Sequence, residues 1–264
     1  MPTKLVVGNW KMNLSVAQAS ALVTALTDDL SARPNVDVVV CPPYLSIPRV
    51  KELTRNTHVK VGAQDVFWVE EGAFTGQVSS KMLHDQCVDY CLVGHSETRG
   101  KFGKLEVPES TIGFFAETDE TVNLKIKALL YYGLVPILCV GETLAEREAG
   151  RTEAVIETQV KGALEGVESA ELYSFVVAYE PVWAIGTGQT CESEEAGRVC
   201  RFVRSTIASV SSDDAAASVR VLYGGSVKPT NSDELFAQDG IDGGLVGGAS
   251  LEADGFARIV LSAS

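Results

Sequence analysis

The sequence lacks features that mark several large classes of protein. Its longest apolar run, residues 131–140, contains a Gly and a Pro and is far shorter than the ~18 apolar residues that a membrane-spanning helix needs. Residues 1–4 and the short apolar stretch after them have neither the basic segment nor the long apolar segment that directs export. We therefore expect a soluble protein of the cytoplasm.

Positive charge is also scarce. The 22 Lys and Arg residues are outnumbered by 35 Asp and Glu residues, which gives a net charge of −13. Such a field repels polyanions, so nucleic acids and anionic membrane surfaces are not expected partners. With 45% hydrophobic residues and only 9 Pro among 264 residues, the composition is that of a folded globular chain.

Patterns of Cys and His that hold metals are missing. No Cys-x-x-Cys pair occurs, and no Cys and His spacing is typical of a metal site. We therefore expect no metal, and we predict that the Cys residues are buried apolar thiols in a reducing compartment. The six Cys stand at positions 41, 87, 91, 139, 191 and 200.

Short runs rich in Val, Ile and Leu recur along the chain, and stretches of helical periodicity separate them. Such runs are typical of parallel strands that are buried on both faces. The clearest helical stretch carries its apolar side chains on one stripe behind a capping Ser15. The predicted strands are 4–7, 37–41, 58–63, 90–93, 134–140, 175–179, 220–223 and 242–246, and the predicted helices are 15–30, 46–54, 79–85, 117–132, 142–164, 192–210, 232–236 and 253–261.

Eight strands that alternate with eight helices give about 33 residues per unit, the size of a strand-plus-helix repeat. No linker rich in Pro, Gly or Ser divides the series, so residues 1–264 are predicted to form a single domain. An open doubly wound sheet and a closed (β/α)8 barrel both fit this alternation. The G-x-G-x-x-G turn of dinucleotide-binding sheets is absent after the first strand. That absence and the unit count favour the α/β barrel.

A barrel places its chemistry at the carboxyl ends of its strands. Polar residues that end predicted strands include Asn9, Lys11, His95 and Glu180. A carboxylate in the place of Glu180 is either paired, partly solvated or used as a base. His95 begins a short helical turn and could act as a neutral hydrogen-bond donor, although a lone His is as often structural. Lys11 could neutralise an anionic ligand, although most isolated Lys residues are merely solvated.

Glycine-rich turns follow the last two predicted strands. They are Gly-Gly-Ser at 224–226 and Gly-Gly at 247–248, and the second leads into the last helix. Loops in these two places grip phosphate in many barrels through backbone N–H groups. A third segment, residues 181–188, has an apolar middle that is unusual for an exposed loop, and we predict that it closes over the ligand as a lid.

Seven motifs, in order, make the chain resemble the triosephosphate isomerase family over nearly its whole length. Such agreement is too extensive for chance. The resemblance implies a TIM barrel. The motifs are GNWKMN at 8–13, GAFTG at 72–76, GHSE at 94–97, CVGE at 139–142, AYEPVWAIGTG at 178–188, YGGS at 223–226 and VGGA at 246–249.

The resemblance also implies an activity, the interconversion of dihydroxyacetone phosphate and glyceraldehyde 3-phosphate in glycolysis and gluconeogenesis. Glu180 would move the proton through an enediolate intermediate, and His95 would polarise the carbonyl and transfer protons between the two oxygens. Lys11 and Asn9 would hold substrate charge. The phosphate would be bound by Gly186, Ser226 and the amides of Gly247 and Gly248, with Glu97 and Cys139 supporting the site.

The resemblance implies no organic cofactor and no metal, because the proton next to a ketose carbonyl is acidic enough once the enediolate is stabilised. It also implies a homodimer. In this family the loop that here includes residues 74–76 docks beside Lys11 and His95 of the other subunit.

Three departures from the family pattern stand out. An opposite-charge pair that can meet across the dimer is replaced by Gln77 and Thr98, so another contact is expected in its place. Residues 100–113 form an insertion, which is either a tolerated surface loop or an extended subunit contact. The lid continues with Gln-Thr-Cys at 189–191, where many members have Lys-Thr-Ala.

Two other functions are compatible with parts of this pattern. Another phosphate-binding barrel enzyme is one of them, but a Schiff-base aldolase would need a Lys deep in a strand near the barrel centre, and the one Lys inside a predicted strand, Lys60, stands early in residues 58–63. A non-catalytic dimeric scaffold is the other. Such a chain is expected to have lost Lys11, His95, Glu180 or the lid, and all four are present.

Overall fold

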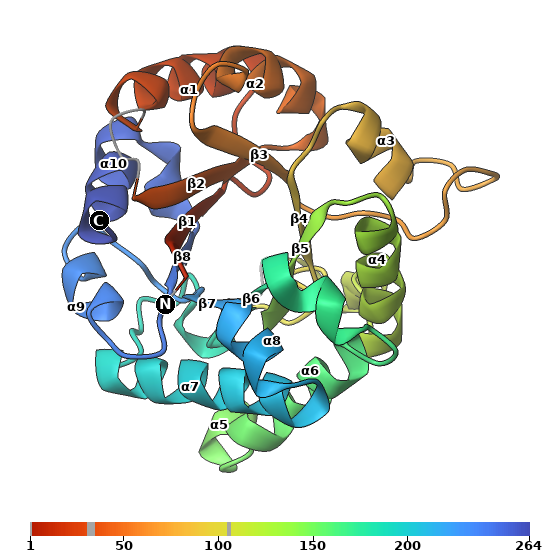
Figure 1. The fold of residues 1–264 in the computed structure, drawn as a ribbon, viewed down its shortest axis with the longest axis vertical. Coiled ribbons are helices and arrows are strands. Elements are labelled where there is room, and N and C mark those ends of the chain that lie inside the picture. The colour runs from red at the N-terminus through yellow and green to blue at the C-terminus, as the bar shows by residue number, and fades with distance from the viewer. Residues whose placement is uncertain (1, 31–34, 105–106) are drawn as a thin grey trace.

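Eight parallel strands close into a barrel in the computed structural model, which describes residues 2–30, 35–104 and 107–264 (Figure 1). Each strand pairs with the next in chain order, and the last pairs with the first. The predicted (β/α)8 barrel is confirmed. The strands are β1 (Lys4–Asn9), β2 (Val36–Cys41), β3 (Val59–Ala63), β4 (Tyr90–Val93), β5 (Val135–Val140), β6 (Val176–Tyr179), β7 (Arg220–Tyr223) and β8 (Gly243–Val246).

Helices surround the barrel on its outside (Figure 1). Most begin and end within a few residues of the predicted bounds. In the described residues they are α1 (Val16–Leu30), α2 (Ile47–Thr54), α3 (Ser80–Asp85), α4 (Asp119–Tyr131), α5 (Leu144–Glu148), α6 (Thr152–Ala163), α7 (Ser193–Val210), α8 (Asp213–Ser218), α9 (Ser232–Phe236) and α10 (Ala253–Ser262).

Two parts of the helix prediction are wrong. The single helix predicted over residues 142–164 is divided into α5 and α6. The chain breaks at Gly150, whose φ of 67° interrupts the helix and is a conformation that glycine adopts at little cost. The other error is α8, which the prediction omitted. Its sequence DDAAAS has only Ala as apolar residues and gives no clear apolar stripe.

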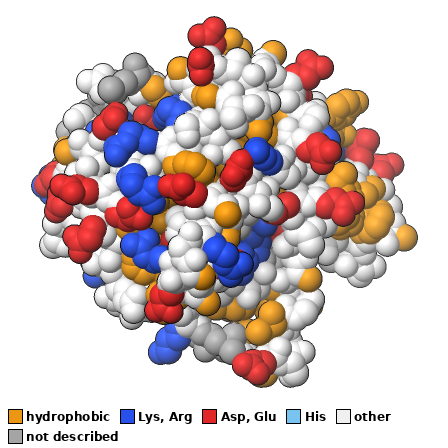
Figure 2. Space-filling view, turned by 90° about the horizontal axis from the view of Figure 1, so that it is seen from below, with side chains coloured by type: hydrophobic (Ala, Val, Ile, Leu, Met, Phe, Trp, Pro, Cys, Tyr) orange, Lys and Arg blue, Asp and Glu red, His pale blue; other side chains and the backbone are white. Residues whose placement is uncertain are grey.

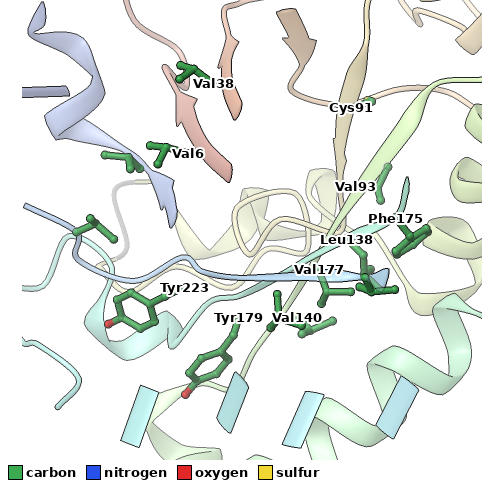
Figure 3. Packing of buried hydrophobic residues seen from close by; sticks show 14 of the residues in the cluster. Val6, Val38, Cys91, Val93, Leu138, Val140, Phe175, Val177, Tyr179 and Tyr223 are labelled. Atoms are coloured by element: carbon green, nitrogen blue, oxygen red, sulfur yellow. The ribbon is translucent and has the colours of Figure 1, made fainter. Parts of the chain in front are cut away.

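Alternate residues of the strands pack on the two sides of the barrel wall. Leu5 and Val7 of β1 belong to a cluster made mainly of strand residues, which fills the interior of the barrel. Val6, between them, belongs to the larger cluster between barrel and helices. Figure 3 shows members of the larger cluster, among them Tyr179 and Tyr223, which extend from β6 and β7 toward the helices. Both sides of the wall are therefore apolar, and the chemistry is confined to the strand ends.

Acidic and basic side chains are interspersed on the outer helices, as Figure 2 shows for the face at the bottom of Figure 1. Arg198 of α7 forms ion pairs with Glu153 at 2.5 Å and with Glu195 at 2.8 Å. Exposed pairs of this kind contribute only about 0–1 kcal/mol each. The excess of negative charge is thus partly balanced by local pairing on this face.

All six Cys residues are free. Five are buried, as predicted, but the prediction is wrong for Cys87, which is exposed just beyond α3. Its φ of 55° belongs to the turn that joins α3 to β4. No helix in the described ranges is long and apolar enough to cross a membrane.

Candidate active site

One cavity of about 310 Å³ brings together the eight residues that the sequence assigned to catalysis or substrate binding, whereas Glu97 and Cys139, which were expected to support the site, do not line it. It lies at the carboxyl ends of the strands, where a barrel places its chemistry. The eight residues are Asn9 and Lys11 at the end of β1, His95 after β4, Glu180 and Gly186 after β6, Ser226 after β7, and Gly247 and Gly248 after β8.

Glu180 and His95 are hydrogen-bonded to each other in this cavity. Glu180 Oε1 lies 2.9 Å from His95 Nε2, and Glu180 Oε2 accepts the backbone N–H of Ser96 at 3.0 Å. The exposed fraction is 2% for Glu180 and 6% for His95. A carboxylate with so little water around it needs such donors to remain ionised.

A backbone hydrogen bond in the turn after β4 determines which nitrogen of His95 carries the proton. The backbone N–H of Glu97 donates to His95 Nδ1 at 3.1 Å, so we assign Nδ1 as unprotonated. The hydrogen is then on Nε2, which donates it to Glu180. The imidazole is neutral in this hydrogen-bond arrangement, and its N–H points at the carboxylate. Burial lowers the pKa of His95, but the Glu180 and Glu97 carboxylates outweigh burial and raise it above its ordinary value.

Several groups act on the pKa of Glu180. Burial raises it, but His95, the N–H of Ser96 and the positive charge of Lys11 outweigh burial and hold the pKa below its ordinary value. Glu180 is therefore a carboxylate, and not a carboxylic acid, near neutral pH.

This lowered pKa predicts a pH-dependent contribution to stability. The contribution is present above the unfolded-state pKa of about 4.3, and it is lost as the pH falls through the lower folded-state pKa. We expect the difference in free energy of unfolding between the wild type and Glu180→Gln to decrease as the pH falls through that acidic window. It also decreases as the pH rises above about 6.5, where the stabilisation of protonated His95, whose pKa Glu180 raises, is lost. Urea unfolding of both proteins from about pH 7 to 3 measures it, and a difference that is constant across the range would contradict the assignment.

Lys11 is fixed in a backbone conformation that residues other than glycine rarely adopt. Its φ is 51°, its N–H donates to Asn9 Oδ1 at 3.0 Å, and its carbonyl accepts a hydrogen bond from Gln64 Nε2 at 2.8 Å. The ammonium group lies 2.6 Å from Glu97 Oε1. These bonds on both sides of Lys11 offset the local strain and hold a positive charge at the cavity.

Backbone groups line the cavity where β7 and β8 end. A Cβ at Gly224 would lie 3.0 Å from Glu180 Cγ, and one at Gly225 would lie 2.2 Å from Tyr223 Oη. Neither position has room for a side chain without displacing a neighbour. After β8, Gly247 and Gly248 open a short helical turn beside Lys11, which leaves peptide N–H groups available for an anion.

The predicted lid, residues 181–188, has two different halves. Its apolar first half is buried: Trp183 Nε1 donates to Glu142 Oε1 at 2.9 Å, and the Arg147 guanidinium lies 4.4 Å from the centre of the Trp183 ring. Its second half begins with Ile185 and Gly186, which line the cavity. The buried apolar residues explain the unusual composition of this loop.

Two residues of this region were not given a role from the sequence. Lys228 lines the cavity and brings a second cation to it. Glu142 is fully buried at the end of β5, and burial raises its pKa although Trp183, Tyr179 and Arg147 oppose that effect. Both Lys228 and Glu142 follow the end of a strand, and this position in the sequence could have identified them as residues of the site.

Thr98 makes a contact inside the chain where the family pattern has a charge. Its hydroxyl is bonded to the Glu117 carboxylate, which also accepts the N–H of Gly94 at 3.1 Å. Glu117 is neutralised by Lys125, whose Nζ is 2.6 Å from both Glu117 Oε1 and Asp65 Oδ1. This network supports the turn that carries His95.

No group of three or more His, Cys, Asp or Glu side chains that could hold a metal ion occurs in the part of the chain that the structure describes. The donors in the cavity include the side chains of two Lys residues, two Asn residues, one His and one Ser, together with peptide N–H groups. This set suits an anionic ligand better than a cation.

The chain is similar to known proteins over nearly its whole length. The family model described as triosephosphate isomerase matches residues 4–263. The triosephosphate isomerase of Trichlorobacter lovleyi is 48% identical over 260 residues, 98% of each chain, and that of Clostridium tetani is 46% identical over 256 residues, 97% of this chain and 95% of the relative. The triosephosphate isomerase of Rhodopirellula baltica is 45% identical over 259 residues, 98% of this chain and 97% of the relative. The chain therefore belongs to the triosephosphate isomerase family.

Proposed function

We propose that the chain interconverts dihydroxyacetone phosphate and glyceraldehyde 3-phosphate in this cavity, with Glu180 as the base. The observation that carries the proposal is the buried Glu180 carboxylate, 2.9 Å from the Nε2 of a neutral His95 in a cavity that also holds a Lys and glycine-rich backbone. A base, a hydrogen-bond donor and an anion site are the three groups that a sugar-phosphate isomerisation requires.

Glu180 takes a proton from the carbon next to the substrate carbonyl. The electron pair of that C–H bond forms the carbon–carbon double bond of an enediolate, and the carbonyl oxygen receives the negative charge. His95 gives its Nε2 proton to that oxygen and takes the proton of the neighbouring hydroxyl, whose oxygen becomes the new carbonyl oxygen. Glu180 returns its proton to the former carbonyl carbon, which completes the exchange of carbonyl and hydroxyl positions. A carboxylate held ionised at neutral pH suits the first step.

His95 and Lys11 stabilise the charge that develops on oxygen. The Nε2–H of His95 is bonded to Glu180, and substrate binding replaces this bond by one from His95 to the substrate oxygen. The side chain of Asn9 and the ammonium of Lys11 add a dipole and a positive charge in a site with little water.

The phosphate is bound at the glycine-rich end of the cavity. Gly186 of the lid, Ser226 and the amides of Gly247 and Gly248 supply the donors, and Lys228 adds charge. Closure of the lid excludes water, which strengthens these bonds and protects the enediolate. We expect no cofactor, because proton transfer between carbon and a carboxylate needs none.

A second copy of the chain is the proposed partner. The loops after β1, β2 and β3 expose Met12 at 96%, Leu45 at 86% and Phe74 at 44% of their surface, and apolar side chains on neighbouring loops are typical of a subunit interface. Sedimentation equilibrium is expected to give twice the chain mass. A mass equal to one chain at micromolar concentration would overturn this proposal.

We also propose a cytoplasmic location. The six free cysteines suit a reducing compartment better than an oxidising one. There the chain takes part in glycolysis and in gluconeogenesis.

The isomerase proposal is tested by a coupled assay with glyceraldehyde 3-phosphate as substrate. We expect rapid turnover without added metal or cofactor. A chain that is folded and dimeric but inactive would overturn the proposal and favour the scaffold alternative.

A further inference from the structure

The inserted segment, residues 100–113, leaves the barrel and returns to it at nearly the same place. Residues 105 and 106 lie outside the described residues. Gly100 has a φ of 69°, and a Cβ there would lie 2.7 Å from the carbonyl oxygen of Phe115. The N–H of Lys101 donates to the carbonyl of Ser96 at 2.8 Å, which ties the start of the segment to the turn that carries His95.

Gly103 of this segment lies directly against the lid. A Cβ at this position would be 2.3 Å from the carbonyl oxygen of Ile185, 2.7 Å from that of Val182 and 3.0 Å from Thr187 Cγ2. The φ of Gly103 is not in the left-handed region, so only the contact with the lid disfavours a larger residue. The two backbones, about 80 residues apart in sequence, are therefore as close as a glycine permits.

The lid lies between Gly103 and the cavity. Ile185 and Gly186 line the cavity, whereas none of the described residues of the inserted segment does. Movement of the lid away from the cavity therefore requires movement of the segment around Gly103.

Contacts of the residues just before Gly103 tie the segment to the rest of the chain. Phe102 packs edge-to-face on Phe115, with ring centres 5.5 Å apart, and Phe115 packs in the same way on Phe114 at 5.3 Å. Lys101 Nζ lies 3.7 Å from Glu146 Oε1 of α5, next to the buried end of the lid. Gly103 itself is exposed, but the contact of Phe102 with Phe115 and that of Lys101 with Glu146 restrict its backbone.

We propose that Gly103 is a positioning residue for catalysis: through it the inserted segment limits how far the lid opens. The proposal deepens the proposed isomerase function and rests on it for its kinetic consequences. It also gives the insertion a role that differs from a neutral surface loop and from a subunit contact, since the segment extends toward the loops after β5 and β6.

A matched pair of glycines in the same segment provides the test. Gly103→Ala adds a methyl group against the lid, whereas Gly113→Ala adds one where nothing lies within 4 Å. Neither position has a left-handed backbone, so both variants are expected to fold. A third variant replaces residues 101–113 by Gly-Gly, which the closeness of Gly100 and Phe115 makes feasible.

Lid motion is measured in the free enzyme by fluorine NMR after 5-fluorotryptophan is incorporated. The chain has three Trp residues, and Trp183→Phe identifies the signal of the lid. We expect Gly103→Ala to change the exchange rate of that signal by about fivefold or more, and Gly113→Ala to leave it unchanged. Equal exchange rates in both variants and the wild type would overturn the proposal.

Gly103→Ala and the variant that lacks residues 101–113 are expected to shift KM in opposite directions. The added methyl group pushes the lid toward the cavity, so Gly103→Ala is expected to lower both KM and kcat as product release slows, and the shortened chain is expected to raise KM. If both variants shift KM in the same direction, the segment does not limit opening. If the wild type has no isomerase activity, the proposed function fails, while the NMR comparison still tests the contact.

Discussion

Replacing Glu180 with Gln is expected to lower kcat by about a thousandfold or more, at the upper end of what a single general base contributes. The amide can still accept the N–H of Ser96, which Glu180 Oε2 now accepts at 3.0 Å. It cannot take a proton from carbon. The variant keeps the size of the side chain and its bond to Ser96, but the amide NH2 that replaces Oε1 cannot accept the Nε2–H of His95.

The assay with glyceraldehyde 3-phosphate measures this loss, and thermal unfolding shows whether the variant is folded. Glu180→Asp is the companion variant. It keeps a carboxylate but withdraws it by one methylene group, so we expect a loss of about a hundredfold, typical of a displaced catalytic group. If Glu180→Gln kept more than about a tenth of the wild-type kcat, another residue would be the base.

The sequence was sufficient to predict the barrel, because both faces of each strand are buried and therefore read as continuous apolar runs. It could not show which side of the wall a residue occupies. Leu5 and Val6 are equally apolar, yet one fills the interior and the other faces the helices. The division of residues 142–164 into two helices was missed because a single Gly150 carries the break.

The members of the candidate site were predictable from their places at strand ends, and all eight line one cavity. The hydrogen bonds and ion pairs that these residues form could not be predicted. The tautomer of His95 depends on the backbone N–H of Glu97, and the pairing of Lys11 with Glu97 joins residues 86 positions apart. Such contacts are set by the geometry of turns, which residue type alone does not specify.

The contact of Gly103 with the lid could not be predicted from the sequence, because it too depends on the three-dimensional course of the backbone. A glycine in a polar insertion suggests a loose loop, and only the approach of a distant backbone shows why a side chain is disfavoured there. The exposure of Cys87 was missed likewise, because the positive φ that ends α3 has no sequence signature in a Cys.

Lys11→Met is expected to lower kcat/KM by about a hundredfold to a thousandfold, the range found when one preorganised electrostatic group is removed from an active site. Methionine keeps the length of the apolar stem but removes the positive charge. Coupled assays of Lys11→Met and Lys11→Arg measure the effect, and Arg is expected to lose less because it keeps a charge.

Loss of folding would not explain this result. The ion pair that Lys11 forms with Glu97 is partly solvated, with 27% and 41% of the two side chains exposed, so its removal is expected to cost only about 0–1 kcal/mol of stability. Glyceraldehyde, which lacks the phosphate, distinguishes an action of Lys11 on the enediolate oxygen from an action on the phosphate. If Lys11→Met slows its isomerisation as much as that of the phosphorylated substrate, the charge acts on the enediolate oxygen. A smaller effect assigns the difference to the phosphate, and no loss with either substrate would remove Lys11 from the site.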